Sequence, residues 1–249
     1  MRTIVSYPHV LMLVVSSPRA MAMPARRSLL ALLAGSSFVL IALYLLAQRA
    51  DFLLAHALLE LQGGHWTLKQ HWLLESFLHR GGRMLSLLAW LTALVLLLVR
   101  WPQRALLRWH APLARLLLTT LLCTIVVGAL KATTHMDCPW DLSAFDGTRP
   151  FISLLTPRPE ALGSPKCFPA AHAATGFAWI GLYFFFAAVR PSWRWVGLAL
   201  GLLLGMAFGL AQQVRGAHFL SHDIASLTLC WWVACVVELF PRSSDRGEA

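Results

Sequence analysis

Residues 212–223, which read QQVRGAHFLSHD, place two histidines, an arginine and an aspartate within twelve positions. An apolar stretch, residues 224–240, follows directly. Ionisable side chains in or beside a membrane segment are costly, so they usually pair with one another or mark a functional site. This segment therefore predicts a membrane protein with a functional site at the start of its last span.

The composition of the whole chain supports a membrane location. Of 249 residues, 58% are hydrophobic and 13% are charged, and the mean hydropathy is +0.64, which is typical of a polytopic membrane protein. The formal net charge is +10. However, the basic residues lie between apolar stretches and form no patch with interleaved aromatics, so we expect no nucleic-acid partner.

The apolar stretches predict an all-α fold, a bundle of six transmembrane helices. About twenty residues at about 1.5 Å each cross a hydrocarbon core of about 30 Å. Residues 51–61 are expected to form an amphipathic helix along the interface between the first two spans. A leader at 1–27, predicted to be disordered, precedes the membrane domain at 28–241, and a polar cytoplasmic tail follows at 242–249. The expected spans are 28–47, 84–99, 116–130, 171–189, 196–210 and 220–240.

With six crossings, the arginines of the short connections fall on one side of the membrane. That side is predicted to be the cytoplasm, with both termini there, because short cytoplasmic loops are enriched in Lys and Arg. The long loop at 131–170 and the connection at 211–219 then share the periplasmic face of an inner membrane. These arginines are Arg26, Arg27, Arg100, Arg104, Arg108, Arg115, Arg190, Arg194, Arg242 and Arg246.

Three residues from distant segments are thus expected at one membrane face: Lys131, His172 and His218. Two imidazoles with a nearby cation suit phosphoryl transfer. One imidazole attacks phosphorus, the other protonates the leaving oxygen, and the cation neutralises charge on the phosphate. This chemistry requires no cofactor and no metal ion.

The segments that carry these residues are KATTHMDCP at 131–139, PAAH at 169–172 and AQQVRGAHFLSH at 211–222. They resemble the three motifs of the type 2 phosphatidic acid phosphatase (PAP2) superfamily of membrane lipid phosphatases. Those motifs are Lys, six residues, Arg-Pro; then Pro-Ser-Gly-His; then Ser-Arg, five residues, His, three residues, Asp. The resemblance covers about 116–240.

The resemblance implies that His218 is the nucleophile, His172 the general acid and Lys131 a phosphate ligand. Several motif positions differ, since Cys138 and Gln212 stand where the family has arginines. Arg215 and Arg149 are candidate replacements as phosphate ligands, together with Ala171 at the family's glycine position. His222 stands at the family's aspartate position and Asp223 follows it; we favour Asp223 as the carboxylate that orients His218.

Two other features leave alternatives open. Cys138 and Cys167 lie in one loop, which is compatible with a disulfide and with two free thiols. His135, Asp137, His218, His222 and Asp223 could instead hold zinc.

We therefore expect a PAP2-type lipid phosphatase that acts at the periplasmic face on a phosphate monoester or pyrophosphate. The alternatives are a phosphotransferase of the same fold and a non-catalytic or metal-binding membrane protein. The expected partners are the phosphorylated lipid substrate and membrane lipids.

Overall fold

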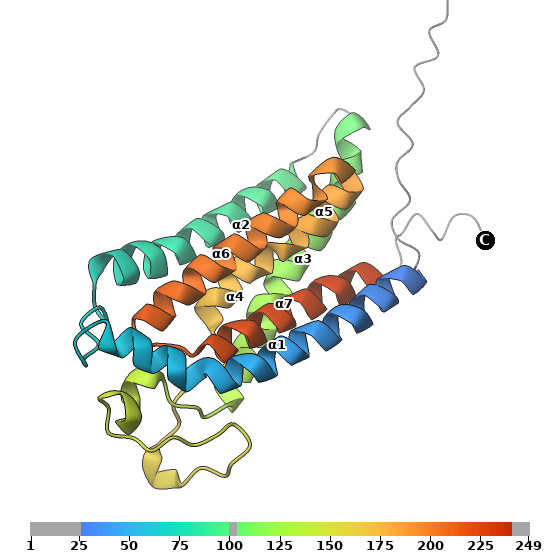
Figure 1. Cartoon of the computed structure of the whole chain (residues 1–249). Coiled ribbons are helices and arrows are strands. Elements are labelled where there is room, and N and C mark those ends of the chain that lie inside the picture. The colour runs from blue at the N-terminus through green and yellow to red at the C-terminus, as the bar shows by residue number, and fades with distance from the viewer. Residues whose placement is uncertain (1–25, 100–103, 241–249) are drawn as a thin grey trace, which may run out of the picture.

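A computed structural model describes residues 26–99 and 104–240 of the chain. These residues fold into a helical bundle without a β-strand, as the sequence predicts (Figure 1). Most of the expected leader and the whole expected tail lie outside the described residues. The main helices are α1 (Arg26–Glu60), α2 (Gly82–Leu98), α3 (Arg104–Thr133), α4 (Ala171–Phe177), α5 (Leu182–Val189), α6 (Arg194–Val214) and α7 (Leu220–Leu239).

Short helical turns extend or connect these helices. The π-helix η1 (Leu73–Gly81) leads into α2, and the 3-10 turn η5 (Ala178–Gly181) joins α4 to α5. With these additions, six helices in the described part of the chain are long and apolar enough to cross a membrane. The remaining turns are η2 (Pro139–Asp141), η3 (Ser143–Phe145), η4 (Glu160–Leu162) and η6 (Pro191–Trp193).

The first span differs in one detail from the expected arrangement. Residues 51–61, expected to form a separate interfacial helix, largely continue α1, which runs for 35 residues to Glu60. The chain has neither Gly nor Pro between Ser36 and Gln62, so nothing breaks the helix before Gly63 and Gly64. At about 1.5 Å per residue, α1 is longer than the bilayer core and reaches beyond it.

The central layer of the bundle is α4 and η5, which pack against α3, α6 and α7. The glycines of α6 make this close packing possible, as their four-residue spacing predicts. Gly201 faces the backbone of Ile180, and a Cβ on Gly205 would overlap the ring of Phe177. On the other side of α7, α1 lies alongside it for most of its length (Figure 1).

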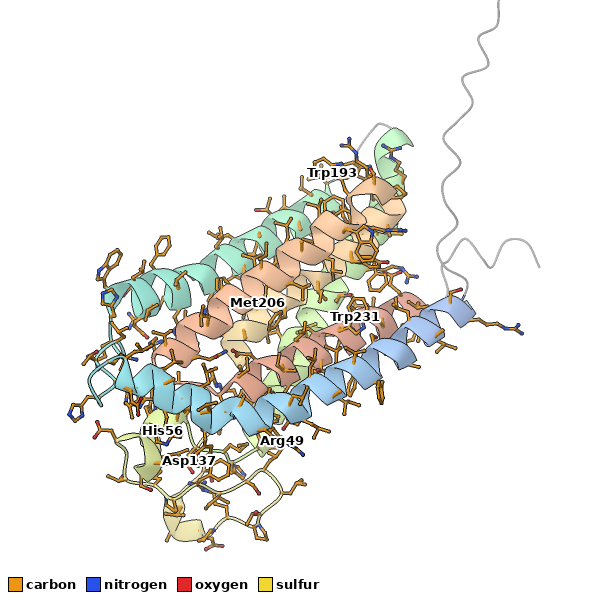
Figure 2. The ribbon with its side chains drawn as sticks, viewed as in Figure 1. Arg49, His56, Asp137, Trp193, Met206 and Trp231 are labelled. Carbon is orange, nitrogen blue, oxygen red and sulfur yellow. A yellow bond between two sulfur atoms is a disulfide. The ribbon has the colours of Figure 1, made fainter. Side chains whose placement is uncertain are left out.

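The connections that carry the three motifs emerge at one end of the bundle. The segment 134–170, which includes Asp137, lies against the C-terminal half of α1, whereas Trp193 marks the opposite end of the bundle (Figure 2). Two features hold this segment to the helices: a disulfide joins Cys138 to Cys167, and the Trp140 N–H donates to the Gly216 carbonyl oxygen at 2.9 Å. The long loop is therefore a folded part of the site end.

Candidate functional site

His218 and His222 lie side by side at the start of α7, and both contact Cys167. The Nδ1 of His222 is 3.1 Å from the Cys167 carbonyl oxygen, and the Nδ1 of His218 is 3.7 Å from the Cys167 sulfur. A carbonyl oxygen and a disulfide sulfur can only accept hydrogen bonds. We therefore place the proton of His222 on Nδ1. A nucleophilic Nε2 on His218 requires the proton of that ring on Nδ1 as well, directed toward the Cys167 sulfur and not toward Nδ1 of His222.

The surroundings of His218 keep its ring uncharged. Burial, the positive charge of Lys131 and the nearby His222 and His172 rings lower its pKa well below the ordinary value. A neutral imidazole has the lone pair that a nucleophile needs. Lys131 lies in the last turn of α3, His172 at the start of α4 and His218 just before α7, so the three residues lie at the same end of the bundle.

His172 is the second residue of α4 and is buried between two aromatic rings. Its ring stacks on Phe208 with 4.7 Å between centroids and meets the edge of His79 at 4.5 Å. The Nε2 atom of His172 has no hydrogen-bond partner among the described residues. Ala171, a candidate phosphate contact, precedes it at the first position of the helix. A buried imidazole with one unused nitrogen can exchange a proton with a bound substrate.

Arg215 lies close to these histidines but is held by protein groups on three sides. It donates to the Lys69 carbonyl oxygen at 2.7 Å and to Oε1 of Gln212 at 3.0 Å, and it forms an ion pair with Glu75. Because these contacts use one hydrogen of each donor nitrogen, the guanidinium is fixed in orientation and has only its remaining N–H groups to offer a phosphate.

Arg149 belongs to a separate ion-pair cluster in the long loop. Its Nη1 is 2.9 Å from Asp137, whose carboxylate also receives Arg158 at 2.6 Å. The side chain of Asp137 is almost completely buried and that of Arg149 is 41% exposed. These arginines neutralise a buried carboxylate and so stabilise the loop, and the structure gives Arg149 no contact with the histidines.

Asp223, which we expected to orient His218, has its carboxylate toward α6. Its Oδ2 accepts a hydrogen bond from Gln213 at 2.6 Å, and the carboxylate packs against Gly209. The ring beside His218 is instead that of His222, with 3.4 Å between the two Nδ1 atoms. The position that holds aspartate in the family motif therefore holds an imidazole in this site.

Two residues of η1 contribute to the site although sequence reasoning did not single them out. Glu75 pairs with Arg215, and His79, one helical turn later, contacts His172. The sequence does contain a signal for them: Glu75 and His79 lie four residues apart just before an apolar span. Ionisable groups there are costly, so they usually pair with one another or mark a functional site. The π-helical geometry of this segment is itself frequent at functional sites.

The structure does not assemble the zinc site suggested by sequence. Asp137 is occupied by its two arginines, and Asp223 faces Gln213. Among the described residues, one group of three possible metal ligands lies within 4.8 Å of one another: Cys167, His218 and His222. In the disulfide form, Cys167 has no thiolate to offer.

Fold and site together define a polytopic helical membrane protein whose buried histidines and lysine meet at one end of the bundle. The family model of the PAP2 superfamily matches residues 112–245, more than half of the chain. The chain belongs to the PAP2 superfamily, and this membership indicates a membrane phosphatase that cleaves phosphoric monoesters. Neither the curated proteins nor the solved structures include a significant match.

Proposed function

We propose that this protein hydrolyses a phosphorylated lipid at the periplasmic face of the inner membrane, through a covalent phosphohistidine at His218. One observation carries the proposal: a neutral His218, with Nε2 available, shares one end of the bundle with His172 and Lys131. These are the three groups that phosphoryl transfer to water needs.

The reaction has two steps. In the first, the Nε2 lone pair of His218 attacks phosphorus, an N–P bond forms, and the P–O bond to the lipid breaks. Protonated His172 gives its proton to the departing alkoxide, and Lys131 neutralises charge on the non-bridging oxygens. In the second step, His172 takes a proton from water, the resulting hydroxide attacks phosphorus, and the N–P bond breaks. Inorganic phosphate leaves, and both histidines return to their starting states.

The position of the site supports a lipid substrate. Lys131 lies near the end of α3 and His172 at the start of α4, so the site is at the boundary of the membrane-spanning segments. The helix η1 presents Glu75 and His79 to the site, whereas Phe77 in η1 and Trp72 just before it are exposed (64% and 66%). An exposed apolar surface next to a polar site allows acyl chains to remain in the bilayer while the headgroup reaches the histidines.

Two independent features support the periplasmic orientation. Arg190 and Arg194, which flank the turn η6, lie beside Trp193 at the opposite end of the bundle (Figure 2), and arginines in short connections are typical of the cytoplasmic side. The Cys138–Cys167 disulfide lies at the site end, and disulfides persist in oxidising compartments such as the periplasm.

Phosphate release from defined lipids tests this function. Purified full-length protein in detergent, with EDTA present, is incubated with phosphatidic acid, phosphatidylglycerol phosphate, a polyprenyl pyrophosphate and phosphorylated lipid A. The wild type is expected to release inorganic phosphate from at least one lipid and the His218→Ala variant to release none. His110→Ala, which changes an exposed histidine of α3, is the matched control and should retain full activity.

Two results would oppose the proposal. Undiminished phosphate release by His218→Ala would exclude His218 as the nucleophile. Movement of phosphate to an acceptor lipid without release of inorganic phosphate would identify a phosphotransferase.

A further inference from the structure

We propose that opening the Cys138–Cys167 disulfide creates a zinc site from Cys167, His218 and His222, and that zinc bound there inactivates the nucleophile. The metal-binding part of this inference stands independently of the reaction. The inactivation part rests on the proposed role of His218.

Two of the three distances between the ligand atoms already match those of a tetrahedral zinc site. The two Nδ1 atoms are 3.4 Å apart, and the Nδ1 of His218 is 3.7 Å from the Cys167 sulfur. Tetrahedral zinc, with Zn–N of about 2.0 Å and Zn–S of about 2.3 Å, separates two nitrogens by about 3.3 Å and a nitrogen from sulfur by about 3.5 Å. All three ligand atoms lie within 4.8 Å of one another, so small side-chain movements would complete the site.

Burial favours the retention of a metal ion at this position. His222 is 0% exposed, Cys167 is 0% exposed and His218 is 8% exposed. One thiolate and two neutral imidazoles are ligands that zinc prefers, and they leave a fourth position for water or for a phosphate oxygen. The Nε2 of His222 has no hydrogen-bond partner among the described residues, and zinc at Nδ1 would replace the hydrogen bond that this ring donates to the Cys167 carbonyl oxygen.

The redox step is an ordinary thiol–disulfide exchange. Cys138 is half-buried and Cys167 is fully buried, so a dithiol attacks the sulfur of Cys138 more readily. The S–S bond breaks, Cys167 leaves as a thiolate beside the two imidazoles, and a mixed disulfide remains on Cys138. The second thiol of the reductant resolves it. The dithiol is oxidised by two electrons to a disulfide, and the protein gains two thiol groups.

Metal binding would inactivate His218 by changing which nitrogen of its ring carries the proton. In the proposed reaction the proton of the His218 ring is on Nδ1 and the lone pair of Nε2 attacks phosphorus. Zinc takes the lone pair of Nδ1, so the proton of the neutral ring must move to Nε2. A protonated Nε2 has no lone pair for phosphorus. Zinc would therefore block the nucleophile.

A matched pair of variants separates the zinc site from loss of the disulfide. Cys138→Ser and Cys167→Ser both remove the bridge, but only Cys138→Ser keeps the proposed thiolate ligand. Both full-length proteins are purified in detergent, freed of metal with a chelator and titrated with zinc against a chelating dye. We expect Cys138→Ser to bind about one more zinc ion per chain than Cys167→Ser. Wild type should gain this site only after reduction with dithiothreitol and removal of the reductant.

Cobalt in place of zinc identifies the ligand directly. The Cys138→Ser variant should show a sulfur-to-cobalt charge-transfer band that Cys167→Ser lacks. The buried cysteines Cys123, Cys230 and Cys235 are present in both proteins, so they cancel in the comparison. Equal metal binding and equal spectra in the two variants, both eluting as folded monodisperse protein, would overturn the zinc site.

Phosphate release tests the second part. Zinc should abolish release by Cys138→Ser, a chelator should restore it, and Cys167→Ser should respond little. Zinc bound to Cys138→Ser with undiminished turnover would overturn inactivation. If no lipid in the panel is hydrolysed even by the wild type, the phosphatase proposal fails while the zinc measurements still decide the metal site.

Discussion

Asp51 on α1 binds the first turn of α7 through Ser221. Its Oδ1 accepts the Ser221 N–H at 2.9 Å, and its Oδ2 accepts the Ser221 hydroxyl at 2.5 Å. Both residues are buried, and they are 170 positions apart in the chain. Free N–H groups at a helix start are normally capped by a side chain that is near in sequence. In α7 a carboxylate that is distant in sequence caps the helix instead. Ser221 lies between His218 and His222, and Asp51 thus fixes the helix start that carries both.

Asp51→Ala should therefore destabilise the site end of the protein. Two hydrogen bonds to a charged acceptor are lost and the buried groups of Ser221 lose their partner, for a cost of about 2–4 kcal/mol. Thermal unfolding in detergent measures the change. Asp51→Asn, which keeps one acceptor oxygen, should lose less. Asp146→Asn is the control, because that carboxylate pairs with exposed His65 at the surface. Equal melting temperatures for Asp51→Ala and wild type would contradict the capping role.

Gly205→Ala should destabilise the bundle because α6 and α4 approach too closely for a methyl group. A Cβ at Gly205 would overlap the Phe177 ring, and overpacking of this kind costs about 1–3 kcal/mol. Gly128→Ala in α3 is the matched control, since nothing lies within 4 Å of its Cβ position. In that open helical position, alanine should be neutral or slightly stabilising. The melting temperatures of the two variants give the comparison, and a Gly205→Ala protein as stable as Gly128→Ala would contradict the close packing.

The Glu75–Arg215 pair should show strong coupling. The two side chains are 22% and 8% exposed, and Arg215 also binds Lys69 and Gln212. Glu75→Gln and Arg215→Met should each cost about 1–3 kcal/mol, and the double variant should cost less than their sum. Arg80→Met removes an exposed partner of the same carboxylate and should cost about 0.5 kcal/mol or less. Additive effects in thermal unfolding would show that the buried pair is not energetically coupled.

The hydropathy pattern of the sequence was sufficient to predict the helical membrane architecture. Long apolar runs require membrane helices, so the six spans and the all-α fold follow from hydropathy alone and are confirmed. The order of Lys131, His172 and His218 in recognisable segments was sufficient for the PAP2 resemblance, which the family model confirms. Lys131 ends the third expected span, His172 begins the fourth and His218 directly precedes the sixth. Because successive spans cross the membrane in opposite directions, these three positions are predicted to lie on the same side.

Partners that are distant in sequence could not be predicted in this way. Asp51 and Ser221 are 170 residues apart, and the helices α2 to α6 lie between Glu75 and Arg215 in the chain. Such contacts depend on how helices pack, and no local periodicity encodes them. The same limit applied to Asp223. Helical spacing favours His222 as the neighbour of His218, and we favoured Asp223 because a carboxylate orients an imidazole better. The carboxylate instead accepts a hydrogen bond from Gln213 on α6, a contact that the local sequence does not encode.

His172 should matter most for substrates with poor leaving groups. An alkoxide needs the proton of the general acid, whereas 4-nitrophenolate leaves without one, so His172→Ala should slow lipid phosphate hydrolysis by about 10²–10⁴-fold. Formation of the phosphoenzyme from 4-nitrophenyl phosphate should be slowed much less. Rapid-quench measurement of nitrophenolate release gives this rate. Equal slowing with both substrates would contradict the general-acid role and point to a purely structural effect.

The most direct test of the account is the isolation of a phosphoryl group on His218. The wild type and the His218→Ala and His172→Ala variants are mixed with a ³²P-labelled lipid phosphate monoester and quenched in base, which preserves phosphohistidine. We predict an acid-labile, base-stable label on residue 218 of the wild type, a longer-lived label in His172→Ala and none in His218→Ala. Turnover by the wild type without any label at residue 218, or a label retained in His218→Ala, would contradict the account.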